Sequence, residues 1–149
     1  MIYLGADHGG FLLKEELKKR LARRRIRFVD CGAPTLDSRD DYPAFARAVA
    51  KAVAKSPRHR GIVLCRSGVG VDIVANKTPR VRSVVATDVW IARRSRRDDN
   101  TNVIALPAEH VSAKQAWAIV SAWRTTKYRR TTRDVRRLRQ IVKIEHATR

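Results

Sequence analysis

Residues 61–70 read Gly-Ile-Val-Leu-Cys-Arg-Ser-Gly-Val-Gly, an apolar run that ends in a cysteine and continues as a loop with two glycines. Short, unbroken apolar runs are typical of parallel strands that are buried on both faces. A helical pattern over 69–77 follows, so the loop leads into a helix N-terminus. Backbone N–H groups and the positive end of the helix dipole converge there, which suits an anion.

The same alternation of apolar runs and helical patterns continues in both directions along the chain. It predicts strands at 2–6, 26–31, 61–65, 82–87 and 102–106. It predicts helices at 11–24, 42–55, 69–77, 89–97 and 111–123, and a final basic helix from about 132 to 146. The expected fold is therefore α/β: a three-layer α/β/α, Rossmann-like domain with a five-stranded, mainly parallel sheet and a C-terminal helix.

Length and composition indicate one domain over residues 1–149, with a basic helical segment from about residue 123. Hydrophobic residues make up 44% of the 149, enough for a packed core. No run approaches the roughly 20 apolar residues that cross a bilayer. The two cysteines, Cys31 and Cys65, are too few for a disulfide framework and lack a metal-binding spacing. We therefore expect a cytoplasmic protein without a metal.

The charge is strongly positive, with 33 Lys and Arg against 14 acids and a net charge of +19. Ten of the basic residues lie within 123–149, against Asp134 and Glu145. Such a surplus predicts attraction to polyanions: nucleic acid, anionic lipid or phosphorylated metabolites.

The candidate functional residues are found at the strand ends, because ligands bind at the carboxyl ends of strands in such sheets. The first strand ends in Asp7-His8-Gly9-Gly10, which is either a turn that caps a helix or a holder of a sugar hydroxyl and a phosphate. Cys65 is either a small core residue or a base beside the positive end of a helix dipole.

Two further sets of charged residues have similarly open interpretations. Asp98 and Asp99 precede the fifth strand, where adjacent carboxylates usually form a solvated turn. Arg133 and Arg137 share one helix face, which is either solvated surface or a phosphate clamp. The 65–70 loop matches neither the nucleotide phosphate loop nor the dinucleotide fingerprint, so no cofactor is expected.

Taken together, six stretches resemble ribose-5-phosphate isomerase type B, a family that includes the galactose-6-phosphate isomerase subunits. They are 3–10, 41–43, 61–65, 67–70, 75–77 and 101–103, in the right order, and the likeness extends from residue 1 to about 145. The resemblance implies a metal-free aldose–ketose isomerase that converts ribose 5-phosphate to ribulose 5-phosphate through an enediolate. It also implies an active site at the interface of a homodimer, or of dimers paired into a tetramer.

The resemblance also implies residue roles. Cys65 would remove the proton next to the carbonyl, and Ser67 would move a proton between the sugar oxygens. Asp98 and Asp99 stand where the family usually has the His-Asn pair that reaches in from the neighbouring subunit, so Asp98 takes the catalytic, ring-opening position and Asp99 a substrate-binding one. The other implied substrate-binding residues are Asp7 for hydroxyls, the N–H groups of Gly68, Val69 and Gly70 for the enediolate, and His8, Arg133 and Arg137 for the phosphate.

Three further positions depart from the family pattern. Arg66 replaces a usual glycine, Glu109 replaces a usual arginine, and Val71 stands where some members have a glutamate base. We hypothesise that Arg66 pairs across the dimer interface with Asp98 or Asp99, because an isolated charge in a half-buried place is costly.

Two alternatives stay open. One is an isomerase of a different five- or six-carbon sugar phosphate, because the ring-opening position has changed. The other is a non-catalytic nucleic-acid-binding derivative, although nine aromatic residues offer little for base stacking. The expected partners are a sugar phosphate and further copies of the chain, with no membrane and only non-specific attraction to nucleic acid.

Overall fold

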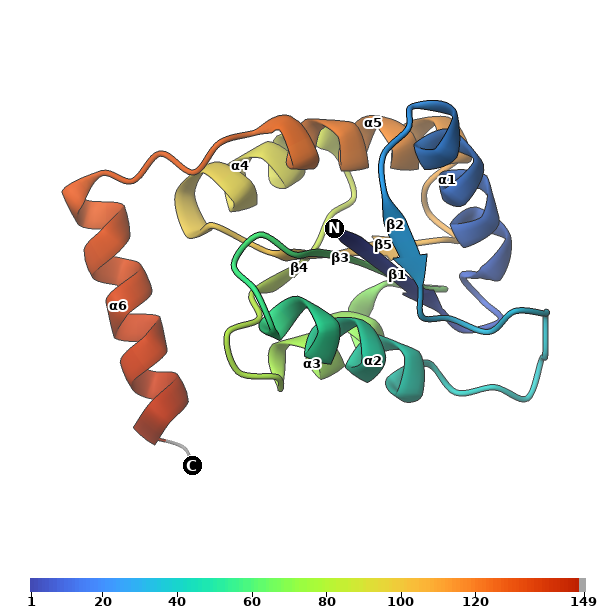
Figure 1. Ribbon diagram of the computed structural model, residues 1–149, viewed down its shortest axis with the longest axis horizontal. Helices are drawn as coiled ribbons and strands as arrows, with labels where there is room; N and C mark the ends of the chain where they lie inside the picture. Colours follow the sequence, from blue (N-terminus) through green and yellow to red (C-terminus); the bar gives the residue numbers. More distant parts are fainter. Residues whose placement is uncertain (148–149) are drawn as a thin grey trace.

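The computed structural model describes residues 1–147, and within this range the chain forms a five-stranded sheet and six helices (Figure 1). Thr148 and Arg149, the end of the predicted domain, lie outside the described residues. The strands are β1 Ile2–Ala6, β2 Phe28–Asp30, β3 Arg60–Cys65, β4 Ser83–Val85 and β5 Val103–Pro107. The helices are α1 Phe11–Arg23, α2 Tyr42–Ala54, α3 Val69–Asn76, α4 Val89–Asp99, α5 Ala113–Thr125 and α6 Thr132–Ala147.

The sheet has the order β2-β1-β3-β5-β4, and all four strand pairings are parallel. The predicted fold class is confirmed. The edge strands β2 and β4 are shorter than predicted, because an edge strand pairs on one side only. The other correction concerns Asp98 and Asp99, which close α4 instead of forming a solvated turn.

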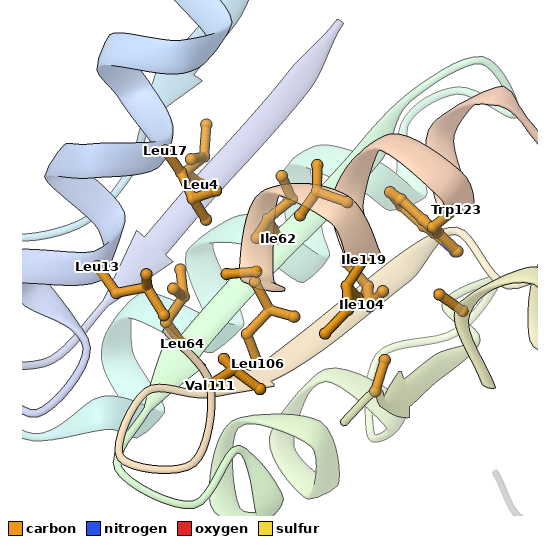
Figure 2. Packing of buried hydrophobic residues seen from close by; sticks show 14 of the residues in the cluster. Leu4, Leu13, Leu17, Ile62, Leu64, Ile104, Leu106, Val111, Ile119 and Trp123 are labelled. Atoms are coloured by element: carbon orange, nitrogen blue, oxygen red, sulfur yellow. The ribbon is translucent and has the colours of Figure 1, made fainter. Parts of the chain in front are cut away.

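Two helical layers cover the sheet (Figure 1). Helices α1, α4 and α5 lie on one face, and α2 and α3 lie on the other. Side chains of β1, β3 and β5 alternate between these two layers, as the strand period of two requires. Figure 2 shows the first layer, where Leu4, Ile62 and Ile104 meet Leu17 of α1 and Ile119 of α5.

The second layer depends on two glycines that bring α2 close to the sheet. A Cβ added to Gly5 would lie 2.8 Å from Val49 Cγ2 and 3.1 Å from the Phe45 carbonyl oxygen. A Cβ added to Gly61 would lie 2.8 Å from Val49 Cγ1 and 2.9 Å from Val103 Cγ2. A larger residue at either position would push the helix away from the strands.

Helix α6 stands apart from both layers (Figure 1). Its start is fixed by Asp134, which is 1% exposed and accepts from Arg129 Nε at 2.9 Å and Nη2 at 3.1 Å. Arg129 holds the pKa of that carboxyl well below its usual range. Further along α6, Ile141 and Val142 remain more than 40% exposed. Helix α6 is thus anchored at its first turn but leaves apolar side chains uncovered.

A search of the helices within residues 1–147 finds none with the length and apolar character needed to cross a membrane.

The tight packing under α2 gives a test of the fold. Replacing Gly61 with Ala should lower the free energy of unfolding by about 1–3 kcal/mol, because the added methyl overlaps buried side chains. Chemical denaturation of both proteins measures this difference. Since the shortest of these overlaps is with Val49, the loss in a Gly61→Ala, Val49→Ala double variant should be smaller than the sum of the two single losses. Additive losses would contradict the proposed overlap.

Candidate active site

The carboxyl edge of the sheet brings together the ends of β1, β3 and β5. Ala6 pairs with Leu64, so Asp7 and Cys65 follow side by side on neighbouring strands. Cys65 in turn pairs with Pro107 of β5. The pairing continues past the strand ends, where Glu109 N–H donates to the Arg66 carbonyl oxygen at 3.1 Å. One edge therefore holds the sequence-predicted Asp7 and Cys65 together with Arg66 and Glu109.

Cys65 is buried, with 6% of its surface exposed, and its sulfur has a backbone donor. Gly68 N–H donates to Cys65 Sγ at 3.2 Å. Gly68 adopts a left-handed conformation with φ of 75°, and a Cβ there would lie 3.1 Å from Pro107 N, so only glycine fits without strain. The Gly68 N–H group therefore points at the sulfur atom that the resemblance names as the base.

The rest of the loop is held by short-range contacts. Val69 N–H donates to Ser67 Oγ at 3.3 Å, and Ser67 itself is exposed. The Tyr42 ring covers Gly70 so closely that a Cβ on Gly70 would lie 2.6 Å from Tyr42 Cζ. The loop thus presents a hydroxyl and the start of α3 beside the Cys65 sulfur.

Asp7 closes the turn after β1. Its Oδ1 accepts from Gly10 N–H at 3.1 Å, and only 6% of the residue is exposed. Burial raises the pKa of this carboxyl above its ordinary value. The sequence left open whether Asp7 caps a helix or holds a substrate. The structure shows that Asp7 closes the turn through its contact with Gly10, and that it does so beside Cys65.

His8 has a partner that sequence reasoning missed. Its Nδ1 lies 2.9 Å from Asp40 Oδ1, and its backbone N–H donates to the same oxygen at 2.8 Å. Asp40 comes from the loop between β2 and α2, 32 residues away. The sequence feature that could have indicated this partner is the acid pair Asp40-Asp41, which follows β2, the strand beside β1. The hydrogen bond that the His8 ring donates to Asp40 raises the pKa of His8 and so favours an imidazolium at this edge.

Arg66 lies at the rim of the same edge. Its Nη1 is 3.5 Å from Glu109 Oε1, and both side chains are about two-thirds exposed, at 64% and 65%. The stem of Arg66 crosses Gly9, where an added Cβ would meet Arg66 Cγ at 2.5 Å. Within one chain Arg66 therefore pairs with Glu109. The hypothesis of a contact with Asp98 or Asp99 concerns a second subunit and stays a prediction.

The remaining predicted site residues lie at the opposite, amino edge. Asp98 ends α4, where its carboxylate is 2.9 Å from Arg94, 3.0 Å from Arg97 and 3.4 Å from Arg129. Asp99 lines a cavity of about 740 Å³ that also touches Ile141 of α6.

Arg133 and Arg137 are exposed on α6. Strand β3 alone separates the two edges by about 17 Å at 3.3 Å per residue. A single chain therefore does not bring Asp98, Asp99, Arg133 or Arg137 to Cys65.

Comparison with known proteins assigns a family to this arrangement. The sequence model of the Ribose/Galactose Isomerase family matches residues 2–141. Ribose-5-phosphate isomerase B of Mycolicibacterium paratuberculosis is 38% identical over 144 residues, covering 97% of this chain and 91% of that protein. The Escherichia coli protein of the same name is 39% identical over 127 residues, which is 85% of each chain.

Solved structures agree with the sequence relatives. Ribose-5-phosphate isomerase B of Clostridium thermocellum superposes with a TM-score of 0.93 at 38% identity, covering 99% of each chain. The Mycoplasma genitalium enzyme, solved with bound ribulose 5-phosphate, also gives 0.93 at 32% identity, covering 97% of this chain and 95% of the other.

The fold and the relatives together place this chain in a class of sugar isomerases that are built on a parallel α/β sheet. The chain belongs to the Ribose/Galactose Isomerase family, and the resemblance seen in the sequence is confirmed. It is an enzyme, as predicted. Among residues 1–147 no cluster of three or more His, Cys, Asp or Glu side chains could hold a metal ion.

The His8–Asp40 pair generates a prediction about pH. Because the folded-state pKa of His8 is raised, the pair stabilises the fold fully below about pH 6.5, and this contribution is lost as pH rises through the raised value. Asp40→Asn should lower the pKa of His8 toward its ordinary value. A proton NMR titration of the imidazole measures it, with His59 and His110 as internal references. Identical His8 titrations in both proteins would contradict the assigned pairing.

Proposed function

We propose that this enzyme interconverts ribose 5-phosphate and ribulose 5-phosphate, with Cys65 as the base. One observation carries the proposal: Cys65 Sγ accepts a hydrogen bond from Gly68 N–H at a sheet edge that also holds Asp7 and His8. The alternative base position is occupied by Val71, which is buried and has no titratable group. The sequence relatives named ribose-5-phosphate isomerase B and the ribulose 5-phosphate complex of the Mycoplasma genitalium enzyme support this substrate.

The chemistry is a proton transfer between neighbouring carbons. The Cys65 thiolate takes the proton from C2 of the open-chain aldose, which leaves an enediolate and a neutral thiol. Ser67 then passes the hydroxyl proton from O2 to O1, and the thiol returns its proton to C1 to give the ketose. Backbone N–H groups at the start of α3, including that of Gly70, stabilise the developing oxyanion. Asp7 holds a sugar hydroxyl.

The phosphate end of the substrate requires a second copy of the chain. His8 lies at the carboxyl edge, whereas Arg133 and Arg137 are exposed on α6 beside the amino edge. In a homodimer, α6 of one copy reaches the Cys65 site of the other and supplies both guanidiniums. The uncovered apolar side chains of α6, Ile141 and Val142, favour such an interface. A tetramer would pair two of these dimers.

In this proposal Asp98 does not open the sugar ring. An ionised carboxylate accepts hydrogen bonds but has no proton to give, and three guanidiniums already surround this one. Asp98 instead positions the end of α4 against Arg129, the residue that also anchors α6. Asp99, the next residue, faces the partner subunit and contacts the substrate. The sugar either binds in its open-chain form or has its ring opened by water.

The main alternative is an isomerase of a different five- or six-carbon sugar phosphate, because Asp98 stands at the family's usual ring-opening position. A panel of five- and six-carbon aldose phosphates, assayed for ketose formation, identifies the substrate with the highest kcat/KM. A six-carbon preference would keep the Cys65 mechanism and replace ribose 5-phosphate. The proposal takes residues 1–149 as one isomerase domain, placed in the reducing cytoplasm, where Cys31 and Cys65 stay free thiols.

Replacing Cys65 with Ala should reduce kcat by about 10²–10⁴-fold, because the base is removed while the backbone loop remains. Initial rates of ketose formation measure the loss, and thermal unfolding checks that the fold persists. Cys31→Ala provides the matched control, since Cys31 is a free cysteine that directly follows the edge strand β2, from which β1 separates the Cys65 strand. Near-normal turnover in Cys65→Ala, or an equal loss in Cys31→Ala, would remove Cys65 from the mechanism.

Replacing Arg137 with Ala should raise KM for the sugar phosphate about 10–100-fold, since a charge-assisted hydrogen bond is lost. The Kd of the unphosphorylated sugar should stay nearly unchanged. Arg136→Ala is the control, because Arg136 is its exposed neighbour on α6 and carries the same charge. Equal weakening of both ligands, or an equal effect of the control, would show that Arg137 does not bind phosphate.

A further inference from the structure

A second recess lies at the amino edge of the sheet, away from the catalytic cysteine. It encloses about 330 Å³ between the end of α2, the start of β3 and the segments before β4 and β5. Arg60 begins β3 and lines the recess, whereas Cys65 ends the same strand. The two places are therefore separated by the length of the strand, and the inference below does not depend on the proposed isomerase reaction.

The lining of this recess is strongly cationic. Its charged residues are Lys55, Arg60, Arg80 and Arg82, and the amides of Asn100 and Asn102 complete the polar surface. No carboxylate is part of the lining formed by the residues that the structure describes. Glu145 lies close to the recess: its Oε1 accepts from the Arg80 backbone N–H at 2.8 Å, and it lines two neighbouring cavities.

The side chains of Arg60 and Arg82 donate to backbone carbonyl oxygens, and burial lowers the pKa of Arg82 although the charge of Glu145 opposes this shift. Arg82 Nη2 donates to the Asn100 carbonyl oxygen at 2.9 Å, and Arg60 Nη1 donates to the His59 carbonyl oxygen at 2.7 Å. Burial, followed by the mutual proximity of these two groups, lowers the pKa of Arg60. Arg96, behind them, has a pKa lowered to about 10 by burial and then by Arg60 and Arg82. Desolvated like charges repel each other, and a bound anion relieves that repulsion.

The backbone around the recess is held in place. Asn102 Nδ2 donates to the Arg80 carbonyl oxygen at 2.7 Å, and Asn102 Oδ1 accepts from Arg82 N–H at 2.8 Å. Arg80 itself has φ of 67°, a left-handed conformation that favours glycine. A long cationic residue therefore occupies a backbone position better suited to glycine, at the rim of the recess that it lines.

We propose that this recess is an anion site for a small phosphorylated molecule, which it binds through the phosphate group. Two features favour a small ligand over a nucleic acid strand. The volume holds a phosphate with a few further atoms, and the site is a recess at one end of β3, not a groove that follows a backbone. Single-stranded binding also relies on stacked aromatic rings, and none belongs to this lining.

Titration with inorganic phosphate at physiological salt, followed by two-dimensional amide NMR, tests the site residue by residue. We expect saturable shifts at the amides of 56–60, 80–82 and 100–102. In an Arg60→Gln, Arg80→Gln variant the Kd from these amides should rise at least tenfold. Arg27→Gln, Arg47→Gln removes the same charge from exposed positions and should change this Kd less than twofold. The backbone amide of His8 reports phosphate at the catalytic edge separately.

A second variant guards against loss of folding. Arg80→Gly removes one cation where glycine fits the backbone, so it should fold and still weaken phosphate binding several-fold. Linear, non-saturating shifts, or the same Kd in all variants, would overturn the proposal. So would saturable binding of a short single-stranded oligonucleotide at these amides without any binding of phosphate.

Discussion

The parallel direction of all five strands is the constraint on which the rest of this structure depends. Because every strand runs the same way, the groups that follow β1, β3 and β5 collect at one edge, and the groups that precede them collect at the other. Cys65 and Arg60 are the two ends of one strand. The chemistry of each edge follows from this arrangement, and no side-chain movement within one chain brings the edges together.

The excess positive charge of +19 is organised, not spread at random. Around Asp98 and Asp134 the arginines pair with carboxylates and fix the path from α5 to α6. At the catalytic edge Arg66 pairs with Glu109 in an exposed contact that contributes little to stability. In the amino-edge recess the guanidinium groups of Arg60 and Arg82 donate to backbone carbonyl oxygens. These environments suit different roles: structural pairing, an exposed surface contact and anion binding.

Most of the fold could be predicted from local pattern, because buried parallel strands are short, unbroken apolar runs whereas amphipathic helices repeat about every 3.6 residues. The loop from Cys65 to Gly70 was predictable for the same reason, since its glycines and its helix start are adjacent in sequence. Asp40 was missed because its contact with His8 spans 32 residues and depends on β2 lying beside β1. The helical state of Asp98 was missed because its three arginine partners come from two separate segments, one within α4 and one before α6.

The central claim is that each active site combines Cys65 of one chain with Arg137 of another. Mixing subunits tests it most directly: Cys65→Ser and Arg137→Ala chains are each expected to be nearly inactive alone at low substrate. Co-expressed in equal amounts, half of the dimers contain one of each, and each such dimer has one intact site. Activity should therefore recover to about a quarter of the unmodified enzyme. Mixtures that stay as inactive as their components would contradict the shared site and place all the catalytic groups within a single chain.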